Sequence, residues 1–291
     1  MTRLIQTLSE VSASYDALFC DLWGCLHNGQ TAYPVAIAAL QTYRAQGGRV
    51  VLLTNAPRPA KAVTRSLERL NVPGDCYDFV VSSGDAAQAG MMMGAVGRQV
   101  YHIGTEKDLP FFTDLPDEFA DADPVTRVPL AEATGIVCTG PFDELTETPE
   151  DYRATFLLAK TNGLKLLCAN PDLVVDLGDQ RIYCAGALAE LYDQMGGTSL
   201  YFGKPHPPIY DLARRRIAPF GISDDRILCI GDGIGTDVKG GMSEGLDTLF
   251  VTGGLSADQF GPDVEAPDAT LLQAWLDVRT LSCTAAIGRL R

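Results

Sequence analysis

Histidine is scarce in this chain of 291 residues, which contains only His27, His102 and His206. The eight cysteines form no CxxC pair, and several lie inside apolar runs, as at Phe19-Cys20 and Leu228-Cys229-Ile230. Tetrahedral zinc sites usually show clustered Cys and His ligands, so this distribution argues against one. We expect the cysteines to be buried, reduced thiols, which is typical of a cytoplasmic protein.

Long apolar runs and an excess of basic residues are also missing. No stretch approaches the roughly 20 apolar residues of a membrane span, and the N-terminal sequence has no apolar core of signal-peptide length. Lys and Arg number 23 against 37 Asp and Glu, a net charge of −14. A field of this sign repels polyanions, so we expect no general affinity for nucleic acid or for an anionic membrane. A phosphate-sized ligand stays compatible, because backbone N–H groups, one lysine and a metal can locally outweigh the global charge.

Two motifs match known fingerprints by letter but lack a required part. Gly241-Met242-Ser243-Glu244-Gly245 fits the G-x-S-x-G nucleophile turn, yet no apolar strand precedes it and no histidine follows it. Gly231-Asp232-Gly233-Ile234-Gly235 has the first two glycines of a dinucleotide fingerprint, but Thr236 stands where the third is needed. We therefore expect neither a serine-hydrolase site nor a dinucleotide site.

Short apolar runs alternate with helical segments through most of the chain, which predicts an α/β fold with a parallel sheet covered on both faces. Helices are expected from about Pro34 to Gly47 and from Pro59 to Leu70. This sheet is expected to contain strands at 17–20, 49–53, 79–81, 199–202, 226–230 and 248–251. The less regular middle holds further strands and an acidic loop. The pattern predicts a discontinuous core domain, 1–84 and 184–291, interrupted by a second domain at 85–183.

Four of the expected core strands end in reactive or phosphate-binding residue types, namely Asp21, Thr54, Lys204 and Asp232. Ligands of open α/β sheets bind beyond the carboxyl ends of the strands, so neighbouring strands bring these residues to one edge. Asp21, Asp232 and the nearby Asp237 offer the hard oxygen ligands that Mg²⁺ prefers. The Thr54 hydroxyl and the Asn55 backbone N–H are suited to hold phosphate oxygens, and Lys204 to neutralise charge. Singly, each residue is an ordinary turn, cap or surface residue; their order and placement carry the prediction.

Together these segments resemble the motifs of the haloacid dehalogenase (HAD) superfamily. Its first motif is similar to Asp21-Leu22-Trp23-Gly24-Cys25-Leu26, and its second to Thr54-Asn55. The third is similar to Gly203-Lys204-Pro205, and the fourth to Gly231-Asp232-Gly233 through Thr236-Asp237. The resemblance is closest to the class IIA branch of NagD-like and 4-nitrophenylphosphatase-like proteins, with further matches at Asn170-Pro171-Asp172 and Gly186-Ala187-Leu188.

The resemblance implies a Rossmann-like core with an inserted α/β cap domain of the C2 type. Only a short segment separates Leu26 from Val50, whereas Asn55 to Gly203 leaves room for such a lid. It also implies an Mg²⁺-dependent phosphatase for a small phosphorylated metabolite, with Asp21 as the nucleophile that forms an aspartyl-phosphate. Asp21, Asp232, Asp237 and the backbone carbonyl of Trp23 would hold the metal. Caps of this branch often mediate dimers, so a homodimer through the cap is open.

Trp23 departs from the family pattern. Phosphatases of this type carry a second aspartate there, which protonates the leaving oxygen and then activates water. Indole can do neither, and such help is worth about 10²–10⁴-fold. We therefore predict a phosphatase that is slow on generic substrates. Two alternatives stay open: a dehalogenase-like hydrolase whose leaving group needs no proton, and a non-catalytic phosphometabolite-binding protein. His27 follows four residues after Trp23, and nothing in the sequence argues that it supplies the missing proton transfer.

Overall fold

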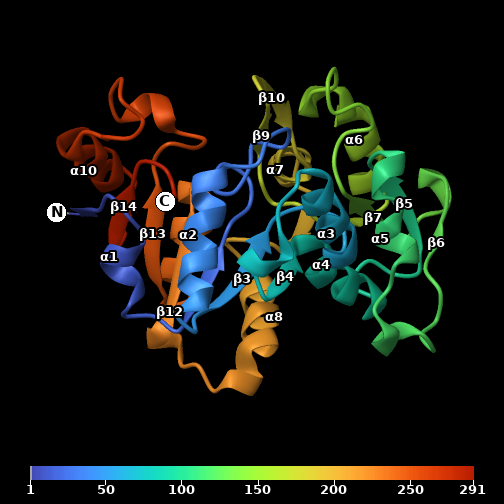
Figure 1. Ribbon diagram of the computed structural model, residues 1–291. Coiled ribbons are helices and arrows are strands. Elements are labelled where there is room, and N and C mark those ends of the chain that lie inside the picture. Colours follow the sequence, from blue (N-terminus) through green and yellow to red (C-terminus); the bar gives the residue numbers. More distant parts are fainter. Residues whose placement is uncertain (1) are drawn as a thin grey trace.

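The computed structural model describes residues 2–291, and over this range the chain forms a seven-stranded and a five-stranded parallel sheet plus a two-stranded hairpin. Figure 1 shows the two sheets in adjacent halves of the molecule. Both ends of the chain, blue and orange to red, build one half, and the middle, green to yellow, builds most of the other (Figure 1). This arrangement confirms the predicted α/β class with a parallel core sheet and an inserted domain.

The core sheet has the strand order β1-β14-β13-β12-β2-β3-β4. Its strands are β1 (Arg3–Leu4), β2 (Ala17–Cys20), β3 (Arg49–Thr54), β4 (Phe79–Ser82), β12 (Ile227–Gly231), β13 (Asp247–Val251) and β14 (Ala285–Ile287). Strand β2 lies between β12 and β3, with Cys20 opposite both Ile230 and Leu52. Because all three strands run in parallel, their carboxyl ends meet at one edge, as the sequence predicts.

Helices cover both faces of the core sheet. They are α1 (Ser9–Ser12), α2 (Pro34–Ala45), α3 (Ala60–Arg69), α8 (Pro207–Ile217), α9 (Lys239–Ser243), which continues a π-helical turn at Ile234–Val238, and α10 (Ala269–Val278). Successive strand side chains point to opposite faces. Leu18 and Leu52 accordingly pack with buried residues of α2 and α3, whereas Phe19 and Val51 pack with those of α8. The near-continuous apolar runs seen in the sequence follow from this burial on both faces.

The second sheet has the order β11-β8-β7-β5-β6. The strands of this domain are β5 (Gln99–Ile103), β6 (Thr126–Arg127), β7 (Gly135–Cys138), β8 (Lys165–Cys168), β11 (Thr198–Tyr201) and the antiparallel hairpin β9 (Val174–Leu177) with β10 (Gln180–Tyr183). Its helices are α4 (Ser83–Met92), α5 (Pro110–Thr113), α6 (Arg153–Thr161) and α7 (Ala185–Gln194). Ile136 packs with buried residues of α6 and α7, and the adjacent Val137 with those of α4 and α5, so this sheet is also covered on both faces.

One strand prediction is wrong. The run at 199–202 is assigned to the core sheet by the sequence pattern, but β11 pairs with β8 of the second sheet, with Leu200 opposite Leu167. Helix α7 also packs on this domain, since Tyr192 lies in the same apolar cluster as Ile136. The second domain therefore continues to about Tyr201, past the predicted boundary at 183. An apolar run shows that a segment is buried, but it does not determine which sheet the segment joins.

All eight cysteines are free thiols, and seven of them are buried in the part of the chain that the structure describes. This agrees with the expected reduced state. No helix between residues 2 and 291 is long and apolar enough to cross a bilayer.

The packing of α6 gives a direct stability test of the second domain. Phe156 is 0% exposed between Tyr152 and Tyr192, whereas the adjacent Leu157 is 59% exposed. We expect Phe156→Ala to lower the free energy of unfolding by about 3–5 kcal/mol, because it removes a buried ring and leaves a cavity. Leu157→Ala, the matched control, should stay within about 0.5 kcal/mol of wild type in urea denaturation. Equal losses in the two variants would contradict the packing described for α6.

Candidate active site

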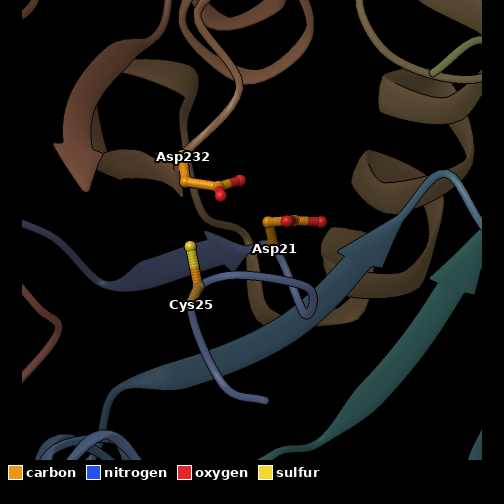
Figure 2. Close-up of side chains that lie close together, drawn as sticks. All are labelled: Asp21, Cys25 and Asp232. Atoms are coloured by element: carbon orange, nitrogen blue, oxygen red, sulfur yellow. The ribbon is translucent and has the colours of Figure 1, made fainter. Parts of the chain in front are cut away.

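Two carboxylates meet at the carboxyl ends of the central core strands. Asp21 follows β2, and its backbone N–H donates to the Ile230 carbonyl at 2.8 Å, which extends the ladder between β2 and β12. Asp232 follows β12, and both side chains are buried. One ligand atom each from Asp21, Asp232 and the Cys25 thiol lie within 4.8 Å of one another. Figure 2 shows these three side chains close together, with Asp21 at the end of β2.

Lys204 reaches the same point although it follows a strand of the second sheet. Its Nζ donates to Asp21 Oδ1 at 2.6 Å, to Asp237 Oδ1 at 2.7 Å and to the Leu53 carbonyl at 2.9 Å. The residue is 2% exposed, so all three ammonium protons are satisfied inside the protein. Of the residues predicted to converge, Asp21, Lys204, Asp232 and the nearby Asp237 lie together, and Thr54 lines a cavity with Asp21. Lys204 enters from the linker between the two domains.

The site holds three buried carboxyl groups and one buried lysine. Burial raises the pKa of Asp232 well above its usual value, and the neighbouring Asp21 raises it further. Burial likewise raises the pKa of Asp237 to about 6, although Lys204 opposes this shift. Burial alone would lower the pKa of Lys204, but Asp21 and Asp237 raise it well above the usual lysine value. The ammonium is therefore charged at neutral pH, and a bound cation would stabilise the ionised forms of the carboxyls whose pKa is raised.

The donor atoms around Asp232 suit a hard divalent cation. Its Oδ2 accepts a hydrogen bond from the Leu255 backbone N–H at 2.7 Å. A Cβ added to either Gly24 or Gly254 would lie 2.0 Å from this oxygen, so both positions need glycine to admit the carboxylate. Cys25 is the soft member of the cluster, but burial raises the pKa of its thiol well above the usual value and keeps it protonated. Carboxylate oxygens without a thiolate fit Mg²⁺ better than zinc.

Asp237 is held differently from Asp232. Its Oδ1 accepts from Lys204, and its Oδ2 accepts from the Gly233 backbone N–H at 3.0 Å. Both oxygens are therefore engaged in hydrogen bonds within the protein. This side chain orients the lysine in addition to any part it takes in holding a metal.

Asn55 organises the loop that carries Lys204. Its side-chain oxygen accepts from the Lys204 backbone N–H at 2.7 Å, and its Nδ2 donates to the Lys204 carbonyl at 3.0 Å and to Asp172 Oδ1 at 2.8 Å. The preceding Thr54 hydroxyl accepts from the Ala56 N–H at 3.2 Å. The Asn55 side chain thus ties together the core, Lys204 and Asp172, a role that the sequence pattern does not predict. The predicted phosphate contacts of Thr54 and Asn55 stay predictions.

Trp23 connects the first-motif loop to the second domain. Its indole Nε1 donates to the Asp176 carbonyl in β9 at 2.6 Å. The indole ring lies edge-on to His27, with the ring centroids 5.3 Å apart. It also packs so closely on Gly29 that a Cβ there would lie 2.4 Å from the ring. The residue that replaces the expected second aspartate therefore holds the β9–β10 hairpin against the core.

Two cavities adjoin Asp21. The smaller, of about 190 Å³, is lined by Lys204, Asp232 and Asp237. The larger, of about 340 Å³, lies between the domains and has a mixed wall that includes Thr54, Arg58, Val63, Leu67, Lys107, Leu177 and Ile182. Asp21, Trp23 and Asp172 line both cavities. A ligand can thus place a charged group next to Asp21 and its organic part in the larger cavity.

Asp172 is the site residue that the sequence analysis missed. It lies between β8 and the β9–β10 hairpin, and burial raises its pKa to about 6 while Lys204 and Asn55 oppose the shift. In the sequence it is recognised only as part of an Asn-Pro-Asp match to the family. Its signal is weak because it sits in the inserted domain, away from the core strand ends that identify the other residues.

Comparison with known proteins agrees with this geometry. Residues 18–115 match a family model described as haloacid dehalogenase-like hydrolase, and residues 201–273 match one described as HAD-hydrolase-like. The 5′-nucleotidase YutF of Bacillus subtilis is 23% identical over 275 residues, which cover 90% of this chain and 98% of that protein. Glycerol phosphate phosphatase Rv1692 of Mycobacterium tuberculosis, solved in complex with magnesium, has the same fold, with a TM-score of 0.61 and 21% identity over 84% of this chain and 69% of that one.

A solved structure from Brucella suis 1330, a hydrolase of the haloacid dehalogenase-like family, covers 99% of this chain and 100% of its own. It is 40% identical, with a TM-score of 0.85. The identity over the full length, the family models and the convergence of all four motifs on one buried site together establish that this chain belongs to the haloacid dehalogenase-like hydrolase family, as its motifs predict.

Proposed function

We propose that this protein is an Mg²⁺-dependent phosphatase that hydrolyses a small organic phosphate through an aspartyl-phosphate on Asp21. The observation that carries the proposal is the buried ammonium of Lys204, 2.6 Å from Asp21 Oδ1 and beside the carboxylates of Asp232 and Asp237. The names of two relatives, a 5′-nucleotidase and a glycerol phosphate phosphatase, support the same substrate class.

Each of these side chains has a part in phosphoryl transfer. The second Asp21 oxygen attacks phosphorus, while Lys204 holds the first oxygen and offsets the charge that gathers on the phosphoryl group. The Thr54 hydroxyl and the Asn55 backbone N–H would bind phosphate oxygens. Asp21, Asp232, Asp237 and the Trp23 carbonyl would hold Mg²⁺, which when bound neutralises phosphate charge and lowers the repulsion between the two anions.

The larger cavity limits the substrate to a small phosphorylated metabolite. Its volume is about 340 Å³, and its wall combines apolar side chains with Arg58 and Lys107. We keep a homodimer through the second domain as a further proposal, to be tested by sedimentation. The eight free cysteines favour a reducing compartment such as the cytoplasm.

A substitution of Asp21 tests its role as the nucleophile. Asp21→Asn should reduce turnover of p-nitrophenyl phosphate with Mg²⁺ at least about 10³-fold, because an amide oxygen is a poor nucleophile and cannot form the intermediate. The matched control is Asp16→Asn at the other end of β2, where an exposed Asp16 pairs with Arg226. It should retain wild-type activity within about twofold.

Other outcomes would identify another function. Unchanged turnover in Asp21→Asn would contradict the proposed intermediate. No turnover by wild type, together with tight binding of phosphorylated metabolites in calorimetry, would instead favour a binding protein. Chloride release from 2-haloacids without Mg²⁺ would favour the dehalogenase-like alternative.

The second prediction concerns the metal. EDTA should abolish turnover, and Mg²⁺ should restore it and raise the midpoint of thermal unfolding, because a ligand of the folded state stabilises it. Asp232→Asn should raise the Mg²⁺ concentration for half-maximal stabilisation on the order of tenfold or more, since it removes a charged ligand. Asp225→Asn, an exposed carboxylate at the other end of β12, is the control and should not change it. A Mg²⁺ response that survives in Asp232→Asn would place the metal elsewhere.

The third prediction concerns Trp23. Trp23→Phe keeps an aromatic ring but loses the hydrogen bond to the Asp176 carbonyl. Such a bond contributes about 0.5–1.5 kcal/mol. We therefore expect KM to rise about 2- to 12-fold, because the β9–β10 hairpin closes less tightly on the core, and kcat to change little. The matched control is Trp275→Phe, whose indole N–H is buried without a hydrogen-bond partner in residues 2–291. A Trp23→Phe enzyme with wild-type KM would show that this contact does not contribute to closure.

A further inference from the structure

The proposed reaction needs a proton donor that Trp23 cannot supply. Splitting an unactivated phosphate ester places charge on the leaving oxygen, and hydrolysis of the aspartyl-phosphate needs a base for water. A replacement must carry a titratable group, line the cavity beside Asp21 and come from a fixed position. Several titratable residues line the larger cavity with Asp21, among them His27, Glu144 and Asp172. Glu144 is paired with Lys107 at 3.4 Å, whereas Asp172 also lines the smaller cavity with Asp21, and His27 lies against the Trp23 ring. His27 and Asp172 are therefore the two candidates.

Asp172 has one engaged and one available carboxylate oxygen. Oδ1 accepts from Asn55 Nδ2 at 2.8 Å, while Oδ2 makes no hydrogen bond to any residue from 2 to 291. Within the same range no hydrogen bond or ion pair joins the Asp172 carboxylate to Asp21, Asp232, Asp237 or Lys204. The second oxygen is therefore free to exchange a proton with a ligand in the cavities that Asp172 lines.

The main chain around Asp172 is fixed by close packing. Its N–H donates to Asn170 Oδ1 at 3.0 Å. A Cβ on Gly203 would lie 2.7 Å from Pro171 Cδ, and one on Gly186 would lie 2.2 Å from the Pro171 carbonyl oxygen. Gly203 lets the Asn170-Pro171-Asp172 turn approach the linker that carries Lys204, and Gly186 lets it approach α7. The carboxyl group is thus held in place from both domains, as proton transfer requires.

His27 is the weaker candidate. Its Nδ1 accepts from the Gly29 N–H at 3.0 Å, and its ring is 5% exposed against Trp23. Burial lowers the pKa of His27 to about 4, so the ring is neutral at physiological pH and a poor source of a proton. Burial raises the pKa of Asp172 to about 6, closer to the working range of an acid and base.

We infer that Asp172 acts as the general acid and general base of this enzyme in place of the residue lost at Trp23. The inference rests on the proposed phosphatase function. In the first step Asp21 attacks phosphorus, the bond to the leaving oxygen breaks, and that oxygen takes the proton of the Asp172 carboxyl. In the second step the Asp172 carboxylate takes a proton from water while the water oxygen attacks phosphorus. The bond between phosphorus and the Asp21 oxygen breaks, and its electron pair returns to Asp21. Alcohol and inorganic phosphate leave, and Asp172 is protonated again.

Leaving-group dependence and burst kinetics test this role. p-Nitrophenolate leaves without being protonated, whereas the alkoxide of glycerol phosphate must take a proton as it leaves. We expect Asp172→Asn to lower kcat for glycerol phosphate about 10²-fold or more. With p-nitrophenyl phosphate the same variant should release about one p-nitrophenolate per active site in a burst, followed by slow turnover, because the aspartyl-phosphate forms but is not hydrolysed. The control is Asp179→Asn, an exposed carboxylate between β9 and β10, which should behave as wild type.

A second-site rescue of the Asp172→Asn variant and a leaving-group series with the wild-type enzyme test the same role independently. Trp23→Asp in the Asp172→Asn background should recover glycerol phosphate turnover, because it returns a carboxyl to the loop after the nucleophile. For a series of aryl phosphates, wild type should show a shallow dependence of kcat/KM on the pKa of the leaving phenol. This second measurement holds even if Asp172→Asn does not fold.

The outcomes that overturn the inference differ from those that overturn the phosphatase proposal. Equal losses on both substrates without a burst would make Asp172 a positioning residue for Asn55. A steep leaving-group dependence in wild type would mean that no acid acts in the first step. A burst in His27→Gln but not in Asp172→Asn would assign the role to His27. Absence of any Asp21-dependent turnover in wild type would instead remove the phosphatase proposal itself.

Discussion

The ammonium of Lys204, buried between Asp21 and Asp237, is the interaction on which the site depends. Taking these charges out of water is costly, and their attraction offsets the cost only with close geometry and full hydrogen bonding. Both conditions are met, since Nζ has three partners within 2.9 Å. Removing one partner would leave an unpaired buried charge. These contacts are therefore better understood as fixing the carboxylate of Asp21, the proposed nucleophile, than as a source of stability.

The same interaction determines how the two domains are joined. Lys204 follows β11 of the second sheet, yet its side chain ends at the edge of the core sheet. Asn55 binds both backbone polar groups of Lys204 and also Asp172, so core and second domain share one hydrogen-bonded network. Such networks hold few alternative arrangements when every member is satisfied. The two domains are consequently joined next to Asp21, at the site described above.

Trp23 stands where the family resemblance predicts a second aspartate, and in the structure its side chain makes a contact between the two domains. The indole N–H donates a hydrogen bond to the hairpin of the second domain at 2.6 Å. The carboxylate cluster beside it is intact, with its hard oxygen donors. A carboxyl from the second domain, Asp172, lies on the same cavity wall. Trp23 and Asp172 thus line the same two cavities as Asp21.

The sequence by itself determined the α/β class, most strand positions and the placement of Asp21, Thr54 and Asp232, because apolar runs that end in Asp or Thr mark the functional edge of a parallel sheet. It also indicated Lys204, although this residue follows a strand of the second sheet and not of the core sheet. Tertiary structure alone decided that β11 joins the second sheet, because burial pattern does not specify a pairing partner. It also decided that Trp23 contacts Asp176 and that Asp172 lines the same cavities as Asp21. These contacts join residues far apart in the chain, and only the packing of one domain on the other brings them together.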